Sequence, residues 1–325
     1  MEKYRVGIVG ATGMVGQRFI SLLKDHPWFE VNCVAASARS AGKTYREAVG
    51  ERWAFSWEIL EKVAGMTVVD AADIDEVSKH VDFVFCAVDM KKDEIRALEE
   101  AYAKHEIPVV SNNSACRGIE DVPMVVPEIN ADHLAVIEAQ KKRLGTKNGF
   151  IAVKPNCSIQ SYVPALTPLL DFEPEKVSVC TYQAISGAGK TFKTWPEMVD
   201  NVIPYIGGED EKSENEPLKL WGHVEDGKIV NATLPVISAQ CLRVACSDGH
   251  MAAVSVSFKK KPTIEQIKER WANYETEAQR LELPSAPKPF LQYFEDPSRP
   301  QTRLDRDFQN GFGVSIGRLR EGSIR

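Results

Sequence analysis

Three side chains that lie far apart in the sequence have the chemistry of a covalent active site: a thiol, a guanidinium and an imidazole. Cys157 lies in the run 154–158, Lys-Pro-Asn-Cys-Ser, and Arg243 and His250 lie close together much later in the chain. A thiolate is a nucleophile, an imidazole transfers protons, and a guanidinium binds a carboxylate through two parallel hydrogen bonds. Together with the glycine-rich segment 10–16, these residues indicate dehydrogenase chemistry through a thioester.

Cys157 is the strongest candidate nucleophile among the seven cysteines. It precedes a helix predicted to begin at Ser158, and a helix N-terminus lowers the pKa of a nearby thiol and exposes its sulfur. The cysteines in apolar, strand-like runs are predicted to be core residues: Cys33, Cys86 and Cys180. The cysteines that lie only beside other candidate site residues are weaker candidates: Cys116, Cys241 and Cys246.

His250 has the best surroundings of the six histidines. It directly precedes a predicted strand at 252–258, and Arg243 lies a few residues before it. A lone histidine in a loop is more often a solvated side chain. The nearby arginine favours a role in catalysis, because a cation on the same pair of strands could hold an anionic substrate.

A second glycine-rich turn, at 183–190, ends another predicted strand and contains Gln183, Ser186 and Gly187. It could present backbone donors to a substrate or to a nicotinamide, and it could equally be a tight turn without a ligand. The charged runs 209–212 and 216–219 are interpreted by default as the solvated face of a helix.

The glycine-rich segment near the N-terminus has the context of a dinucleotide-binding turn, because it lies between a predicted strand and a predicted helix. Glycine there lets backbone N–H groups approach a pyrophosphate, and the helix N-terminus adds positive potential. The spacing is G-x-x-G-x-x-G, and a turn that merely connects strand to helix is the alternative. The residues expected to contact the coenzyme are Gly10, Thr12, Gly13, Met14, Val15 and Gly16.

The end of the second predicted strand favours NADP over NAD. An NAD site usually carries an acidic residue there for the ribose 2′-hydroxyl. Residues 36–43 contain no acid, but they contain the hydroxyls of Ser37 and Ser40 and the cations of Arg39 and Lys43. Such a segment suits a 2′-phosphate, with Arg39 as the charge-assisted contact. The alternative is a solvated polar loop.

Composition narrows the class of protein. The 325 residues are 43% hydrophobic and 26% charged, with a net charge of −6, which argues against a nucleic-acid partner. No apolar run approaches the length needed to cross a membrane, and the first residues do not form a secretory signal. The cysteines lack disulfide or zinc spacing, so we expect reduced thiols, no metal and a cytoplasmic location, with a small molecule as substrate.

The two halves of the chain have different patterns. In the first, strands alternate with helices, which predicts an α/β, Rossmann-type parallel sheet. The strands are expected at 5–9, 30–36, 67–69, 81–88 and 108–111, and the helices at 16–23 and 92–105. The second half predicts an α+β domain with a mixed sheet, with strands at 150–153, 177–185, 229–234, 252–258 and 313–318, a proline-interrupted helix from 158 and a helix at 263–277. The predicted domains are 1–155 and 156–325.

The motifs together resemble aspartate-semialdehyde dehydrogenase, in order and over essentially the whole chain. The segments that carry the resemblance are 10–16, 37–43, 112–117, 155–158, 183–190 and 243–250. Two of the segments, 112–114 (Asn-Asn-Ser) and 205–209 (Tyr-Ile-Gly-Gly-Glu), look like the branch found in archaea and fungi.

The resemblance implies an NADPH-dependent reductive dephosphorylation of L-aspartyl 4-phosphate to L-aspartate 4-semialdehyde. This reaction leads toward lysine, threonine, methionine and isoleucine. It also implies that the second domain serves both catalysis and dimerisation, in a homodimer or homotetramer.

The resemblance also implies a role for each matching residue. Three would be catalytic: Cys157 as the nucleophile, His250 as the general acid and base, and Gln183 as the residue that orients the acyl group. Five would bind substrate: Arg243 the carboxylate, Arg117 and Lys212 the phosphate, Glu209 the amine, and Asn156 the intermediate. The second glycine turn would add Ser186 and Gly187 to the coenzyme contacts.

Two features depart from the family pattern. The first is the presence of Cys116 and Cys246 beside site residues, where their oxidation could affect the site. The second is that family members usually continue beyond the point where this sequence ends at Arg325, so we expect a 325-residue form to have an incomplete nicotinamide wall, weak NADP binding and slow turnover. The alternatives to the implied activity are an acyl-CoA reductase such as malonyl-CoA reductase, an N-acetylglutamyl-phosphate reductase, and a non-catalytic relative.

Overall fold

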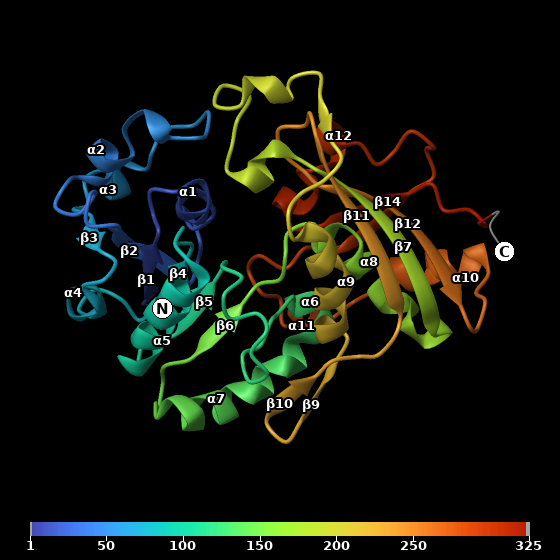
Figure 1. The fold of residues 1–325 in the computed structure, drawn as a ribbon, viewed down its shortest axis with the longest axis horizontal. Coiled ribbons are helices and arrows are strands. Elements are labelled where there is room, and N and C mark those ends of the chain that lie inside the picture. The colour runs from blue at the N-terminus through green and yellow to red at the C-terminus, as the bar shows by residue number, and fades with distance from the viewer. Residues whose placement is uncertain (1, 323–325) are drawn as a thin grey trace. The chain divides into compact units, whose positions relative to one another are not determined.

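The computed structural model describes residues 2–322. The chain divides into two compact units (Figure 1). The first consists of Met1–Val125, Asp132–Lys154 and Val224–Ile229, and the second of Val126–Ala131, Pro155–His223 and Val230–Arg325. The main change of unit therefore falls between Lys154 and Pro155, and two short segments depart from this simple division.

The first unit is built on a parallel sheet of six strands in the order β3-β2-β1-β4-β5-β6. This is the strand order of the Rossmann fold, with the chain reversing direction across the sheet between β1 and β4. The strands are β1 (Tyr4–Val9), β2 (Phe29–Ala36), β3 (Val69–Asp70), β4 (Phe83–Cys86), β5 (Val109–Ser111) and β6 (Ile151–Val153). The predicted fold class is confirmed, and the predicted strands match within a few residues.

Helices connect these strands, as parallel pairing requires. They are α1 (Met14–Leu22), α2 (Tyr45–Val49), η1 (Gly50–Arg52), α3 (Glu61–Ala64), α4 (Ile74–Ser78), α5 (Lys92–Lys104), α6 (Pro127–Asn130), η2 (Ala131–Val136) and α7 (Ile137–Leu144), of which α6 belongs to the second unit. Apolar residues of α1, β1 and β2 form one core cluster, which includes Val6, Ile8, Ile20, Val31 and Val34. That packing fixes α1 against the carboxyl end of β1.

The second unit contains a mixed sheet in the order β12-β7-β11-β8. Its strands are β7 (Pro174–Gln183), β8 (Val202–Ile203), β11 (Val236–Val244) and β12 (Met251–Phe258). β7 pairs in parallel with β11, where Gln183 lies opposite Arg243, and antiparallel with β12, where Tyr182 lies opposite Met251. The end of β7, the end of β11 and the start of β12 therefore lie side by side at the same end of the sheet.

Shorter elements complete the second unit. The helices are η3 (Ile159–Ser161), α8 (Val163–Leu166), η4 (Thr167–Phe172), η5 (Ile185–Ala188), η6 (Pro196–Met198), α9 (Glu209–Leu220), α10 (Ile264–Ala272), α11 (Glu277–Arg280), α12 (Thr302–Asp305) and η7 (Phe308–Gly311). β13 (Leu291–Phe294) pairs with β14 (Val314–Gly317). β9 (His223–Glu225) pairs with β10 (Lys228–Val230), and most of this hairpin, Val224–Ile229, belongs to the first unit. A core around Trp271 and Phe290 joins α10 to β13. Within residues 2–322, no helix is long and apolar enough to span a bilayer.

Three predicted elements of the second half differ from the structure. The strand predicted at 229–234 is only the three residues of β10, and the long strand β11 that follows it was not predicted. The predicted helix from Ser158 is a series of short turns, η3, α8 and η4, because prolines interrupt it. The helix predicted at 263–277 stops at Ala272.

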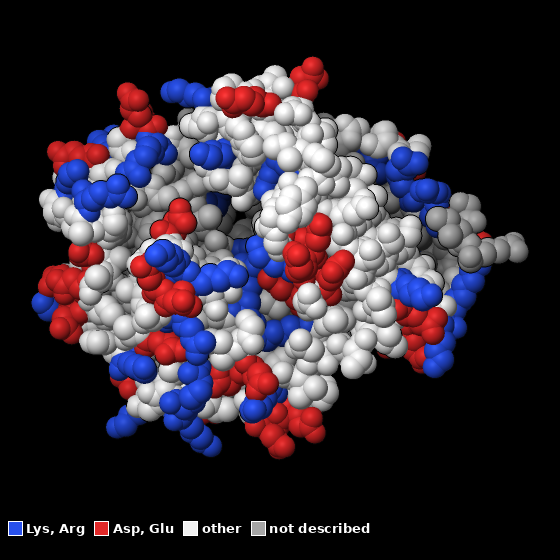
Figure 2. Space-filling model, in the orientation of Figure 1, with Lys and Arg blue, Asp and Glu red and all other residues white. Residues whose placement is uncertain are grey.

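Charged side chains are interspersed over the face shown in Figure 2, where basic and acidic residues alternate in small groups. This mixture agrees with the small net negative charge of the sequence.

Candidate active site

A thiol and an imidazole lie within hydrogen-bond distance in the second unit. The Nε2 atom of His250, directly before β12, is 3.2 Å from the Sγ atom of Cys157. The other ring nitrogen, Nδ1, accepts the backbone N–H of Ala184 at 3.0 Å. Because Nδ1 is the acceptor, the neutral ring carries its proton on Nε2, the atom that faces sulfur. His250 is thus arranged to donate a hydrogen bond to a thiolate.

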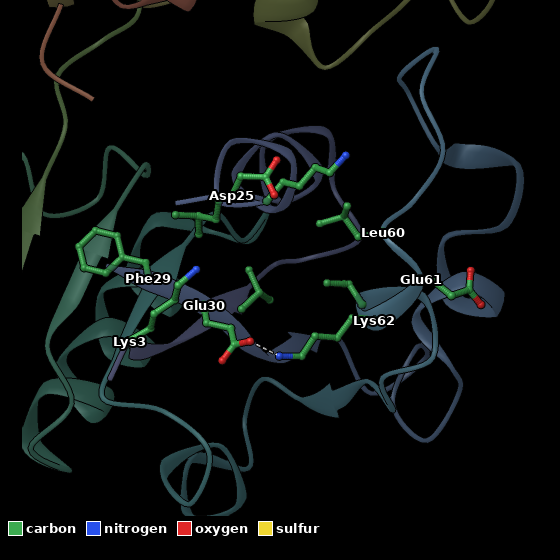
Figure 3. Close-up of a pocket in the computed structure, with 11 residues that line it drawn as sticks. Lys3, Asp25, Phe29, Glu30, Leu60, Glu61 and Lys62 are labelled. Atoms are coloured by element: carbon green, nitrogen blue, oxygen red, sulfur yellow. Dashed lines mark hydrogen bonds and ion pairs between the residues drawn. The ribbon is translucent and has the colours of Figure 1, made fainter. Parts of the chain in front are cut away.

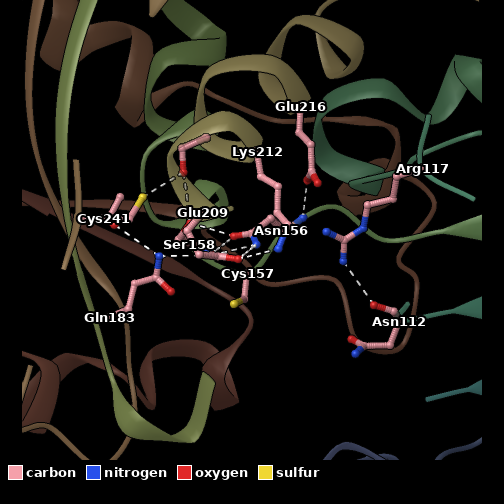
Figure 4. Close-up of polar contacts among 12 residues, drawn as sticks. Asn112, Arg117, Asn156, Cys157, Ser158, Gln183, Glu209, Lys212, Glu216 and Cys241 are labelled. Carbon is pink, nitrogen blue, oxygen red and sulfur yellow. Dashed lines mark hydrogen bonds and ion pairs between the residues drawn. The ribbon is translucent and has the colours of Figure 1, made fainter. Parts of the chain in front are cut away.

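The turn that carries the thiol is fixed by Asn156. Its Oδ1 accepts the backbone N–H of Ser158 at 2.8 Å and the Ser158 hydroxyl at 2.7 Å (Figure 4). The element after Cys157 is the single 3₁₀ turn η3, not the regular α-helix that the sequence predicted. The position of the sulfur therefore depends on this side-chain hydrogen bonding.

Glu209, the first residue of α9, is the centre of a buried polar cluster (Figure 4). Its carboxylate accepts hydrogen bonds from Nδ2 of Asn156 at 2.9 and 3.0 Å, from Nε2 of Gln183 at 3.2 Å and from Nζ of Lys212 at 2.7 Å. Burial alone would raise the pKa of Glu209, but Lys212 and the two amides outweigh it, so the pKa lies below its usual value. Glu209 is ionised at neutral pH.

Arg243, near the end of β11, is a buried cation with only 6% of its surface exposed. Its Nη1 donates to the carbonyl of Ala184 at 2.7 Å. Burial lowers its pKa and the negative charges of Cys157 and Glu209 oppose that shift, and a guanidinium stays protonated in either case. Arg243 lies on β11 and His250 directly precedes β12, and these two strands do not pair, because β7 lies between them. The expectation of one shared strand pair is therefore wrong.

Gly187 lies in close contact with the side chains of Arg243 and His250. A Cβ atom on Gly187 would lie 2.9 Å from Nη1 of Arg243 and 3.1 Å from the His250 ring. The second glycine-rich turn, η5, therefore packs against Arg243 and His250, and a larger residue at position 187 would have to displace the end of the Arg243 side chain or the His250 ring. The coenzyme contacts predicted for Ser186 and Gly187 remain predictions.

Seven of the eight predicted catalytic and substrate-binding residues belong to the second unit, and one belongs to the first. The seven are Asn156, Cys157, Gln183, Glu209, Lys212, Arg243 and His250. Arg117 belongs to the first unit, where its Nη2 donates to the carbonyl of Asn112 at 3.2 Å. Its role in phosphate binding remains a prediction from the resemblance.

The alternative nucleophiles are poorly placed. Cys116 and Cys241 are buried, and burial raises the pKa of both thiols. Cys246 is half-buried, with its sulfur 3.1 Å from the Thr302 hydroxyl. Cys33 and Cys86 lie in the core as predicted, whereas Cys180 is only half-buried.

The glycine turn of the first unit fits a dinucleotide in its backbone geometry. Gly10 has a φ of +88°, and a Cβ there would lie 2.3 Å from the carbonyl oxygen of Ala87. A Cβ on Gly16 would lie 2.4 Å from the carbonyl oxygen of Gly10, so this glycine allows α1 to pack on the turn. Gly13 is exposed, and a Cβ there would meet nothing closer than 3.5 Å. These are the three roles that glycines have in dinucleotide turns: the turn, the approach of a pyrophosphate and the helix packing.

The remaining predicted coenzyme contacts lie on or just after this turn. Thr12, Met14 and Val15 belong to the turn and to the first turn of α1, whose N–H groups are available to an anion. Ser37 and Arg39 are exposed directly after β2, and Ser40 donates its backbone N–H to the carbonyl of Ser37 at 2.8 Å.

A separate hollow of the first unit, of about 250 Å³, lies at the other end of β2 (Figure 3). It is lined by the start of β2 and by α3, with Lys3, Glu30 and Lys62 among its residues, and Glu30 and Lys62 form an ion pair across it. The carboxyl ends of parallel strands, where ligands bind in this fold, are at the opposite edge.

Sequence reasoning missed three residues that shape the site: Ser158, Ala184 and Glu216. Ala184 contributes only its backbone, so no side-chain pattern could reveal it. Glu216 was assigned to a solvated helix face, yet it accepts the backbone N–H of Asn156 at 2.5 Å. The spacing of Glu209 and Glu216, nearly two turns of helix, was the signal that both lie on one face.

The fold and the site together indicate a class: a chain with a Rossmann-type unit and a second unit that holds a thiol–imidazole pair has the parts expected of a dehydrogenase. Comparison with known proteins agrees. Residues 5–137 match the family description "Semialdehyde dehydrogenase, NAD binding domain", and residues 166–325 match "Semialdehyde dehydrogenase, dimerisation domain".

Individual relatives resemble the whole chain. The aspartate-semialdehyde dehydrogenase of Archaeoglobus fulgidus is 42% identical, over 99% of this chain and 90% of the relative. That of Aspergillus fumigatus is also 42% identical, over 99% and 88%. The crystal structure of the Candida albicans enzyme with NADP matches with a TM-score of 0.88 and 36% identity, over 99% of this chain and 91% of the other. The chain belongs to the aspartate-semialdehyde dehydrogenase family, and is an oxidoreductase of amino-acid biosynthesis.

Proposed function

We propose that this protein converts L-aspartyl 4-phosphate to L-aspartate 4-semialdehyde and phosphate, with NADPH as reductant and a thioester on Cys157 as intermediate. The observation that carries the proposal is the 3.2 Å contact between His250 Nε2 and Cys157 Sγ, in a unit that also holds Arg243 and Glu209. A thiol with a proton-transfer partner is the basis of covalent acyl chemistry.

In the first step the thiolate of Cys157 attacks the acyl carbon of the substrate. The new S–C bond replaces the C–O bond to phosphate, and phosphate leaves with the electron pair of that bond. The Nε2–H of His250 stabilises the thiolate before attack. Lys212 is the second-unit cation for the departing phosphate, because its ammonium is only partly engaged by Glu209.

In the second step the thioester is reduced to the aldehyde and the thiolate is released. When bound, NADPH supplies a hydride for this reduction. The Nε2–H of His250 donates a hydrogen bond to the acyl oxygen as negative charge develops there, and that charge returns to sulfur when the S–C bond breaks and the aldehyde forms. Gln183, only 1% exposed, orients the acyl group from the end of β7.

The amino-acid end of the substrate is recognised by opposite charges. The Arg243 guanidinium suits the α-carboxylate, since two parallel hydrogen bonds match its planar fork. Glu209 suits the α-ammonium group, because its pKa is held low and its carboxylate stays ionised. The Asn156 amide holds Glu209 in place and lies beside the nucleophile.

The coenzyme is NADP, held by the first unit. The glycine turn fits a pyrophosphate at Gly13, and the exposed Arg39 follows β2 where an NAD enzyme usually has an acid. The Candida albicans relative solved with NADP supports the same choice.

The protein works as a homo-oligomer in the cytoplasm. Residues 166–325 match a dimerisation domain, and one face of its sheet exposes apolar side chains of two neighbouring strands: Tyr182 of β7 and Val236 of β11. An exposed apolar sheet face favours association with a second copy. The seven free cysteines fit a reducing compartment.

The test is the reverse reaction, followed by the absorbance of NADPH. Purified protein with aspartate semialdehyde, phosphate and NADP should form NADPH, and omission of phosphate should abolish it. Coenzyme A in place of phosphate tests the alternative of an acyl-CoA reductase. Activity that requires coenzyme A and ignores phosphate would overturn the proposed substrate.

A further inference from the structure

We propose that Glu216 is a positioning residue that holds the Cys157 thiol in its attacking position through the backbone of Asn156. The inference rests on the proposed function for the identity of the nucleophile. Glu216 does not touch the sulfur. It acts on the residue directly before it.

The contact is a short, charge-assisted hydrogen bond. The Oε2 atom of Glu216 accepts the backbone N–H of Asn156 at 2.5 Å (Figure 4). Hydrogen bonds to ionised groups are shorter and stronger than neutral ones. Glu216 lies nearly two helical turns after Glu209, so both carboxylates face the thiol turn from the same side of α9.

Asn156 is consequently held at three of its polar groups. Glu216 takes the backbone N–H, Glu209 takes the side-chain Nδ2, and Ser158 donates to Oδ1. Asn156 is 5% exposed, so water does not compete for these bonds. A residue fixed at both backbone and side chain leaves Cys157 little freedom to rotate away from His250.

The helix that carries Glu216 is itself anchored to the strand of Arg243. On another face of α9, Asp210 accepts the backbone N–H of Cys241 at 2.8 Å and Glu214 accepts that of Ala239 at 3.1 Å. Both N–H groups belong to β11. α9 therefore links the thiol turn to the strand that bears the substrate-binding guanidinium, and Glu216 is its contact with the nucleophile side.

The experiment compares two substitutions with a matched control. Glu216→Ala removes the acceptor, Glu216→Gln keeps an acceptor without charge, and Glu211→Ala removes an exposed glutamate of the same helix. The first readout is the rate of Cys157 alkylation by iodoacetamide, below the melting temperature of every variant and without substrate. The second is the separation of kcat from KM in the assay above.

Glu216→Ala should slow both alkylation and kcat by about tenfold to a hundredfold, with KM and NADP affinity nearly unchanged. Glu216→Gln should recover part of both losses, and Glu211→Ala should match the wild type. Unchanged alkylation and kcat in folded Glu216→Ala, or in Glu216→Gln if the alanine variant does not fold, would overturn the inference. Alkylation requires no substrate, so its result stands even if the proposed reaction is wrong.

Discussion

The glycine turn of the first unit and the thiol turn of the second are held in different ways. The glycine turn is shaped by the backbone, because a Cβ on Gly10 or Gly16 would collide with backbone atoms of neighbouring segments. The thiol turn is shaped by side chains from outside it, through His250, directly before β12, and through Glu209 and Glu216, both of α9. Substitutions in the two units should therefore have distinct effects. Changes in the second unit should abolish catalysis and leave coenzyme affinity unchanged. Changes in the first unit should weaken coenzyme binding and leave the reactivity of the Cys157 thiol unchanged.

The largest effect should come from Cys157→Ser. A serine hydroxyl is a far weaker nucleophile than a thiolate, so kcat should fall by about 10⁴-fold or more. NADPH fluorescence titration should give an unchanged Kd, because the glycine turn is untouched. Substantial turnover by this variant would mean that another group forms the intermediate.

Next in size, Arg243→Lys should lower kcat/KM by about a hundredfold, mainly through KM, since lysine cannot form the two parallel hydrogen bonds. His250→Ala should instead act mainly on kcat, because it removes the hydrogen-bond donor that stabilises the thiolate and the negative charge on the acyl oxygen. Steady-state kinetics of both variants will distinguish these patterns. The same kinetic pattern in both would show that the division of roles is incorrect.

Gly13→Ala tests the first unit alone. A Cβ there has room in the free protein, so the variant should fold, but the methyl group would occupy the space needed by a pyrophosphate. We expect NADPH affinity to fall by about tenfold or more, and Cys157 alkylation to proceed at the wild-type rate. A slower alkylation rate would contradict the expectation that substitutions in the first unit leave the thiol of the second unaffected.

Arg39→Ala should have a narrower effect on coenzyme choice. The lost contact to a 2′-phosphate should weaken NADPH binding by about tenfold to a hundredfold and leave NADH binding nearly unchanged. Parallel titrations with both coenzymes measure this difference. Equal losses would assign Arg39 to a solvated loop.

The smallest effect concerns acid stability. The pKa of Glu209 is lower in the folded protein than its ordinary value of 4.5, so its stabilising contribution is present above that pH and is lost as the pH falls through the lower, folded pKa. Urea midpoints of wild type and Glu209→Gln should therefore converge as the pH is lowered below about 4.5. Parallel curves would show that Glu209 is not stabilised by its partners.

The same contrast explains what the sequence could predict. The parallel sheet and its glycine turn follow from local patterns, because each strand is an apolar run and each glycine acts on its neighbours. β11 was missed because its buried positions, which alternate correctly, include Ala239, Cys241 and Arg243, and such residues do not form an apolar stripe.

The candidate site was only partly predictable for a related reason. The residue types at Cys157, Arg243 and His250 suggested the chemistry, but their meeting depends on the order of strands in the second sheet. Glu216 contacts the backbone of the distant Asn156, and Ala184 contacts the distant His250 through its own backbone; no local pattern specifies either contact.

The carboxylates of α9 that hold β11 have one more consequence, for how the protein behaves in a crowded solution. β8 pairs with β11 only at Arg243 and Val244, so the rest of that side of the strand would be an open edge. Open edges invite strands of other molecules to pair and begin aggregates. Asp210 and Glu214 occupy the N–H groups of that edge and place negative charge beside it. α9, which positions the site residues, therefore also prevents β11 from pairing with strands of other molecules.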